Sequence, residues 1–152
     1  MVVDFFVSGD GEVPFSKLLE NLERFDFSIE EFKQSQTKIP GVHYFHNNQM
    51  IYENRCNRIA PAEISSPCLT GLFDSFLQEG LYPTIQFTRG CPFSCAYCTE
   101  GHTYYSKVQR FSLKQFEQEI TYISDNKCSN ENRLMVVDSS LECIKMTLKL
   151  PG

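Results

Sequence analysis

The feature that most constrains this 152-residue chain is a group of three cysteines, Cys91, Cys95 and Cys98, with the spacing C-x3-C-x2-C. Three thiols within eight residues can converge on one small inorganic centre without ligands from a distant part of the chain. The triplet follows an apolar run, 84–88, that predicts a buried strand, and it precedes a helical pattern that begins near Ser112. The fold therefore has to present this loop at the end of a strand.

Two kinds of metal centre fit three close cysteines. A [4Fe–4S] cluster is normally held by four cysteine thiolates, so three thiolates leave one iron with an open position, where metal chemistry takes place. A zinc ion is the alternative, and it needs a fourth ligand from His102, Cys68 or Cys128. The cysteines outside the triplet show no ligand spacing among themselves, and we interpret them as small buried apolar residues; they are Cys56, Cys68, Cys128 and Cys143.

Composition narrows the class of protein. A hydrophobic content of 41% and a charged content of 22% are ordinary for one soluble globular domain. The net charge of −5 offers no basic surface for nucleic acid, and no apolar run reaches the roughly 18–20 residues of a membrane span, so neither partner is expected. Residues 1–9 carry Asp4 and no basic residue, so we expect no signal peptide. Seven cysteines without such a signal favour reduced thiols and a cytoplasmic location.

The first part of the chain reads as a strand followed by a helix. Residues 2–7 are β-branched and aromatic, which predicts a strand. Residues 15–25 place apolar side chains on one helical stripe, and Pro14 suits the start of that helix. The stripe consists of Phe15, Leu18, Leu19, Leu22 and Phe25. A strand, a glycine turn and a helix make up the repeating unit of an α/β fold.

The middle of the chain, 27–82, is less regular. Residues 39–46 and 48–52 predict a β-hairpin that turns at Asn47 and Asn48. An irregular stretch rich in proline and serine follows, and 71–81 predicts a short helix that ends at Gly80.

The cysteine segment predicts a βαβ unit. Ser112 and Gln115 form a capping-box pattern at the start of a helix, whose apolar face consists of Leu113, Phe116, Ile120 and Ile123. Residues 134–137 then predict a second buried strand that ends at Asp138. The cysteine loop thus lies at the carboxyl end of the first strand, the end at which (β/α) barrels carry their active sites. The fold class is α/β.

Several motifs together resemble the radical S-adenosylmethionine (SAM) enzymes. The run 89–98 (RGCPFSCAYC), with Tyr97 before the third cysteine, resembles their cluster signature. Residues 9–12 and the helix after them look like the last unit of a cobalamin-binding domain, and 39–44 resembles the hairpin that follows such a domain. Residues 66–74 resemble the linker of these enzymes, with a cysteine where tyrosine is usual. The chain is therefore similar to the cobalamin-domain-associated class of radical SAM enzymes.

This resemblance implies a division of the chain. Residues 1–26 are expected to be the last βα unit of a flavodoxin-like, cobalamin-binding-like domain, and 27–82 a linker with a hairpin. Residues 83–140 are expected to begin a (β/α) radical SAM barrel, with 141–152 as a divergent tail. A barrel needs roughly 200 residues, whereas 61 residues follow Cys91. We therefore expect a fragment of a longer protein.

The resemblance also implies a chemistry. Cys91, Cys95 and Cys98 become ligands of a [4Fe–4S] cluster whose fourth iron binds SAM, and Tyr97 packs near the adenine. One electron, delivered by a flavodoxin or ferredoxin, cleaves the sulfonium C–S bond and gives methionine and a 5′-deoxyadenosyl radical that acts on a substrate. Asp138 becomes a SAM contact or the N-cap of another helix.

Two departures limit this interpretation. The D-x-H-x-x-G loop that supplies the lower histidine ligand of cobalamin is absent from the sequence, so cobalamin is expected only in full-length relatives. After residue 139 the sequence no longer follows the family pattern and alternates apolar and polar residues, as in a lone edge strand. A non-catalytic iron–sulfur or zinc module, or a degenerate remnant, is the alternative. The substrate and the reaction type cannot be read from these residues.

Overall fold

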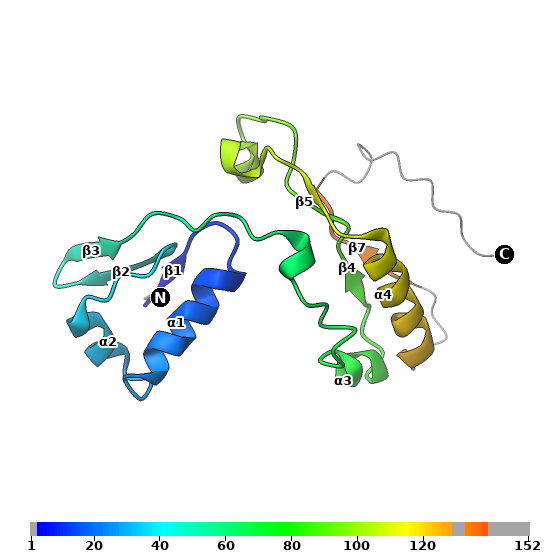
Figure 1. The fold of residues 1–152 in the computed structure, drawn as a ribbon, viewed down its shortest axis with the longest axis horizontal. Helices are drawn as coiled ribbons and strands as arrows, with labels where there is room; N and C mark the ends of the chain where they lie inside the picture. The colour runs from blue at the N-terminus through cyan, green and yellow to red at the C-terminus, as the bar shows by residue number, and fades with distance from the viewer. Residues whose placement is uncertain (1–2, 129–132, 140–152) are drawn as a thin grey trace. The chain divides into compact units, whose positions relative to one another are not determined.

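The computed structural model describes residues 3–128 and 133–139, which form a mixed α/β structure. The chain divides into two compact units, Met1–Ile59 and Ala60–Gly152, and each is described by itself (Figure 1). Cys143 and the predicted tail strand lie outside the described residues. In the part of the chain that the structure describes, no helix is long and apolar enough to cross a membrane.

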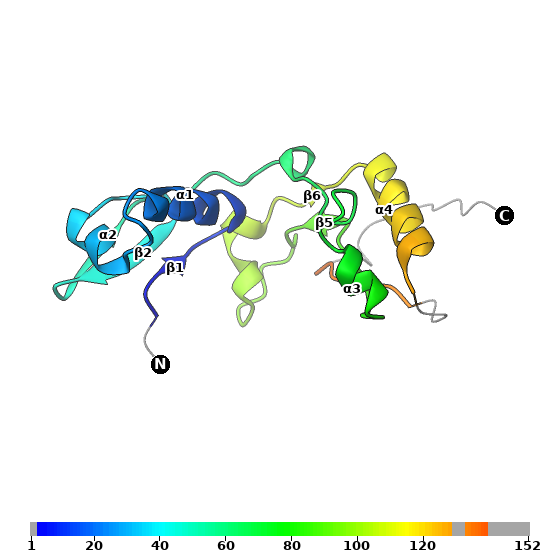
Figure 2. The same ribbon diagram turned by 90° about the horizontal axis from the view of Figure 1, so that it is seen from below.

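The first unit is a small antiparallel sheet covered on one face by two helices. Its strands are β1 (Phe6–Val7), β2 (Val42–His46) and β3 (Gln49–Tyr52), in the order β1-β2-β3. The helices α1 (Glu12–Glu23) and α2 (Ile29–Ser35) lie on the same side of the sheet (Figure 2). The predicted first helix is confirmed, whereas of the strand predicted over 2–7 the structure has Phe6–Val7, and this strand pairs antiparallel with β2.

The predicted hairpin is confirmed, and its turn has the expected chemistry. Asn47 and Asn48 have φ values of 48° and 60°, and His46 pairs with Gln49 across them. Two positive φ angles give the turn a twist that matches the right-handed twist of the strands, which is why asparagine is favoured there.

Aromatic residues dominate the core of the first unit. Phe32 of α2 is fully buried, and the rings of Phe5, Phe25 and Tyr44 lie 5.4–5.8 Å from its ring. The remaining buried members of this core are Leu18, Leu22, Ile39 and Val42. Helix α2 was not predicted, although Ser28 accepts the N–H of Glu31 at 3.3 Å as an N-cap. The pattern Ser-x-x-Glu at 28–31 was the signal that could have revealed it.

The second unit contains the predicted βαβ unit. Strand β4 (Thr84–Ile85) pairs parallel with β7 (Met135–Val136), and helix α4 (Leu113–Asn126) lies between them in the sequence. The expected strand over 84–88 is split, however. Its second part, β5 (Thr88–Arg89), pairs antiparallel with β6 (Gln109–Arg110). No closed barrel is present among residues 3–128 and 133–139.

Helix α4 covers the β4–β7 pair and follows its predicted pattern in part. The Ser112 hydroxyl accepts the N–H of Gln115 at 3.1 Å, as the capping box predicts. The Gln115 side chain does not complete the box, because its amide donates to Glu119 at 3.1 Å. Phe116 and Ile123 are buried, whereas Leu113 is 60% exposed. The ring of Phe116 packs on that of Phe87, with centroids 3.6 Å apart.

The remaining elements of the second unit are short. Helix α3 (Asp74–Gln78) lies within the predicted helix, and the N–H of Gly80 returns to the carbonyl of Leu77 at 3.4 Å. Three 3-10 turns cover Pro61–Glu63, Thr99–Gly101 and Thr103–Tyr105. The last two turns lie inside the cysteine loop.

Candidate functional site: the cysteine loop

The cysteine loop joins β5 to β6, and the pairing of these two strands closes its base (Figure 2). Thr88 pairs with Arg110 at this base. Gly90 then has a φ of 103°, a conformation that residues with a side chain rarely adopt, so a glycine is required where the chain turns into the loop. The N–H of Cys91 donates to the carbonyl of Tyr105 at 3.0 Å and joins the two arms of the loop.

Backbone turns order the segment that carries the second and third cysteines. The N–H of Cys98 donates to the carbonyl of Cys95 at 3.1 Å, and the N–H of Gly101 donates to the carbonyl of Cys98 at 3.0 Å. A Cβ atom at Gly101 would overlap the carbonyl oxygen of Cys95 and lie 3.2 Å from its backbone nitrogen. Only glycine therefore fits at this point, and its close approach fixes the backbone around Cys95.

The three cysteine side chains are reachable from solvent. Cys91 is half-buried, Cys95 and Cys98 are exposed, and all three thiols are free. Across residues 3–128 and 133–139, no group of three or more histidine, cysteine or acidic side chains is arranged to hold a metal ion. The three cysteines are close together in the sequence of one loop, but their side chains do not converge on a metal site among the described residues. The donor type, three soft thiols, suits an iron–sulfur cluster or zinc.

Three further residues of the 89–102 segment differ in their exposure and contacts. The Tyr97 side chain is 94% exposed and is available for stacking on a ligand. His102 is exposed and its carbonyl accepts the N–H of Tyr105 at 2.9 Å. The Arg89 side chain donates to the Gln86 amide oxygen at 3.3 Å and lies 5.9 Å from the centre of the Phe111 ring.

The cysteines that were candidates for a fourth zinc ligand occupy different environments. Cys68 is 3% exposed and packs in the core beneath α4. Burial raises the pKa of its thiol, and the carboxylates of Glu119 and Asp74 raise it further, so the neutral thiol is favoured over the thiolate that a metal binds. Cys128 is exposed, and its N–H donates to the carbonyl of Leu77 at 3.2 Å.

Asp138 has a role that sequence reasoning missed. Its Oδ1 atom accepts the N–H groups of Phe87 and Thr88, at 2.9 and 3.0 Å. Its Oδ2 atom is buried and has no hydrogen-bond partner among the described residues. The sequence placed Asp138 at the end of a strand, but the identity of its partners depends on the parallel pairing of β4 with β7.

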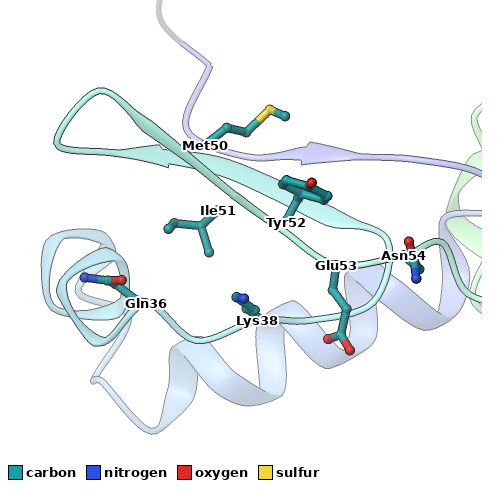
Figure 3. A pocket seen from close by; sticks show the side chains of 7 residues that line it. All are labelled: Gln36, Lys38, Met50, Ile51, Tyr52, Glu53 and Asn54. Carbon is teal, nitrogen blue, oxygen red and sulfur yellow. The ribbon is translucent and has the colours of Figure 1, made fainter.

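A concave region lies in the first unit, along β3. It has a volume of about 450 Å³ and is open to solvent (Figure 3). Its lining includes Lys38 and Glu53, which have opposite charges, and the apolar side chains of Met50 and Ile51. This mixed lining defines no ligand class, so the cysteine loop remains the candidate site.

A βαβ unit with three free cysteines on the loop after its first strand is the arrangement expected at the start of a radical SAM domain. Comparison with known proteins confirms the resemblance. The chain is distantly homologous to cobalamin-dependent radical SAM methyltransferases. No protein-family model matches it.

Three relatives carry this homology. The 2-(S-pantetheinyl)-carbapenam-3-carboxylate methyltransferase of Streptantibioticus cattleyicolor is 28% identical over an alignment that covers 97% of this chain and 21% of the relative. The cobalamin-dependent radical SAM methyltransferase TokK of Streptomyces tokunonensis is 27% identical over 131 residues, covering 80% of this chain and 18% of TokK. An uncharacterized methyltransferase of Pyrococcus horikoshii is 27% identical, covering 91% of this chain and 31% of the relative. The chain thus spans about 18–31% of the length of these proteins.

Proposed function

We propose that this chain carries the cluster-binding segment of a radical SAM protein, with Cys91, Cys95 and Cys98 as ligands of a [4Fe–4S] cluster. The observation that carries the proposal is the group of three free thiols on a loop whose base is closed by β5 and β6. Homology to radical SAM methyltransferases along most of the chain supports the cluster over other metal centres.

The residues of the loop would have different roles in such a site. The three thiolates would hold the cluster, and the turns at Gly90 and Gly101 would set the backbone from which they project. Tyr97, which is exposed, would lie against the adenine of SAM. When bound, the cluster supplies the electron that cleaves SAM into methionine and a 5′-deoxyadenosyl radical, and a flavodoxin or ferredoxin is the proposed electron donor.

We also propose how the chain relates to a longer protein. Residues 1–26 would correspond to the end of a cobalamin-binding-like domain, 27–82 to a linker and 83–140 to the first part of a radical SAM barrel. Because the sequence lacks the D-x-H-x-x-G motif, cobalamin is proposed for full-length relatives and not for these residues. A cytoplasmic location remains a prediction, supported by six free cysteines among the described residues.

Iron binding by cysteine variants tests the proposal. The chain is purified without oxygen and reconstituted with iron and sulfide, and we expect about four irons per chain. Cys91→Ala, Cys95→Ala and Cys98→Ala should each abolish the iron–sulfur absorption. Cys128→Ala is the matched control, because Cys128 is also an exposed free thiol of the second unit.

The metal content of the chain, together with the variants Cys128→Ala and His102→Ala, separates the proposed cluster from a zinc site. A non-catalytic zinc module would contain stoichiometric zinc and no inorganic sulfide, and loss of metal in Cys128→Ala or His102→Ala would identify its fourth ligand. That result would overturn the cluster assignment.

A further inference from the structure

The strand that leads to the cysteine loop changes its partner within a few residues. Ile85 pairs with Val136 in the parallel β4–β7 ladder, and the N–H of Val137 donates to the Ile85 carbonyl at 3.0 Å. Two residues later, the carbonyl of Phe87 accepts the N–H of Phe111 at 2.9 Å, so this part of the chain has joined the strand of β6. A strand that leaves one ladder for another exposes backbone N–H groups that need a new acceptor.

The carboxylate of Asp138 supplies that acceptor. One oxygen, Oδ1, receives the N–H groups of both Phe87 and Thr88. Phe87 is 7% and Thr88 is 2% exposed, so solvent has little access to replace these two hydrogen bonds. Asp138 therefore holds the chain at the point where β4 ends and β5 begins.

We propose that Asp138 is a positioning residue for the cysteine loop, and that it acts through the backbone of Phe87 and Thr88. This inference rests on the proposed cluster-binding function. Only Arg89 and Gly90 separate Thr88 from Cys91, so the two hydrogen bonds fix the place from which the first cysteine departs. On the loop side of Gly90, the hydrogen bond from the Cys91 N–H to the Tyr105 carbonyl fixes the backbone of Cys91.

The two oxygens of Asp138 allow a conservative variant to isolate this role. Oδ2 has no partner among the described residues, so Asp138→Asn can place its amide nitrogen there and keep a carbonyl oxygen at the Oδ1 position. Asp138→Ala removes the acceptor completely. If Asp138 acts through its hydrogen bonds to Phe87 and Thr88, Asp138→Asn should keep the loop in place, whereas Asp138→Ala should release it.

The two hydrogen bonds from the N–H groups of Phe87 and Thr88 to Asp138 are called the clamp below. Amide hydrogen exchange on the full chain without metal tests this clamp independently of the cluster. In Asp138→Ala we expect the amides of Phe87 and Thr88 to exchange at least ~10-fold faster than in the wild type, while the amides of α4 keep their rates. Asp138→Asn should stay close to the wild type. Asp125→Ala, an exposed position on α4, is the control that should change neither.

Thiol alkylation then reports on the loop itself. Cys91 is half-buried and Cys95 is exposed, so loss of the clamp should raise the alkylation rate of Cys91 towards that of Cys95, with Cys128 unchanged. Unchanged exchange at Phe87 and Thr88 in Asp138→Ala would overturn the proposal, and so would an equal acceleration throughout the second unit. If the wild type binds no cluster but Asp138→Ala still loosens Cys91 selectively, the proposed function fails and the positioning role stands.

Discussion

The two units differ in the longest strand pair that each contains. In the first unit β2 and β3 pair over four residues, whereas its β1–β2 pair and both pairs of the second unit are two residues long. In the first unit, β2 and β3 are joined by a two-residue turn, and three aromatic rings surround the fully buried Phe32. In the second unit, β4 pairs with a strand 51 residues away, and each pair of strands is two residues long. Strands that are far apart in the sequence lose more chain entropy when they pair. Short strands regain little of that cost, because they make few contacts. The second unit should therefore be the less stable one.

The difference also concerns function. The first unit buries its aromatic residues in a core, whereas the second unit leaves Cys95, Cys98 and Tyr97 exposed on a loop. A segment that binds a metal centre has to keep its thiols accessible until the metal binds. The exposed thiols on this loop meet that requirement. Since metal binding contributes directly to folding free energy, the cluster would stabilise the unit that is weaker without it.

The largest expected effect is a loss of stability that is confined to the first unit. Phe32→Ala removes a side chain with 0% exposure and should cost about 3–5 kcal/mol of unfolding free energy. Chemical denaturation followed by tyrosine fluorescence measures this loss. Iron binding by the cysteine loop should persist. An equal loss of iron and of stability would show that the two units fold as one.

Phe116→Ala should produce a smaller loss in the second unit. The ring is 4% exposed and packs on Phe87, so truncation should cost about 3 kcal/mol. Leu113→Ala on the same helix is the matched control, because Leu113 is 60% exposed and its truncation should change stability by less than about 0.5 kcal/mol. Equal effects of the two variants would contradict the packing of α4 on β4.

Gly101→Ala should disturb the cysteine loop without unfolding either unit. The added methyl group would overlap the carbonyl of Cys95, so the backbone between Cys95 and Gly101 has to shift. We expect loss of most of the reconstituted iron with a change in unfolding free energy of about 1–2 kcal/mol. Gly11→Ala, where no atom lies within 4 Å of the new Cβ, should retain its iron. Full iron content in Gly101→Ala would show that the loop tolerates the shift.

The smallest expected effect is a pH dependence that arises from Cys68. Burial raises the pKa of this thiol above its ordinary value of 9.0, so the folded second unit retains a proton that the unfolded chain loses. Stability from this group is present below pH 9 and falls as the pH rises through the folded-state pKa. Cys68→Ser should flatten the dependence of the unfolding free energy on pH above pH 9, measured by denaturation. An identical slope in the wild type and the variant would rule out Cys68 as the cause.

Sequence reasoning succeeded where the signal was local. Asn47 and Asn48 predicted the hairpin turn, and Ser112 predicted the start of α4, because a turn or a cap depends on a few neighbouring residues. The parallel pairing of β4 with β7 followed from the strand–helix–strand order, because parallel neighbouring strands joined by a helix form a right-handed crossover. The motif at 89–98 predicted the homology that the relatives confirm.

The missed features depend on contacts between distant residues. The break between β4 and β5 is visible only when Phe87 is found to bond to Asp138, which lies 51 residues away. The apolar stripe of α1 did not reveal that Leu18 and Leu22 are buried while Phe15 remains 53% exposed, since this depends on where the sheet lies. The three cysteines were identified from their spacing, but spacing does not determine how their side chains are arranged.

The central claim is that Cys91, Cys95 and Cys98 hold a [4Fe–4S] cluster, and the most direct test is the metal and sulfide content of the anaerobically prepared chain. We predict about four irons and four sulfides per chain in the wild type, and neither in a variant with all three cysteines replaced by alanine. Addition of SAM should alter the electron paramagnetic resonance spectrum of the reduced cluster, because one iron has no cysteine ligand. One zinc per chain without sulfide, or iron that survives the triple replacement, would contradict the account.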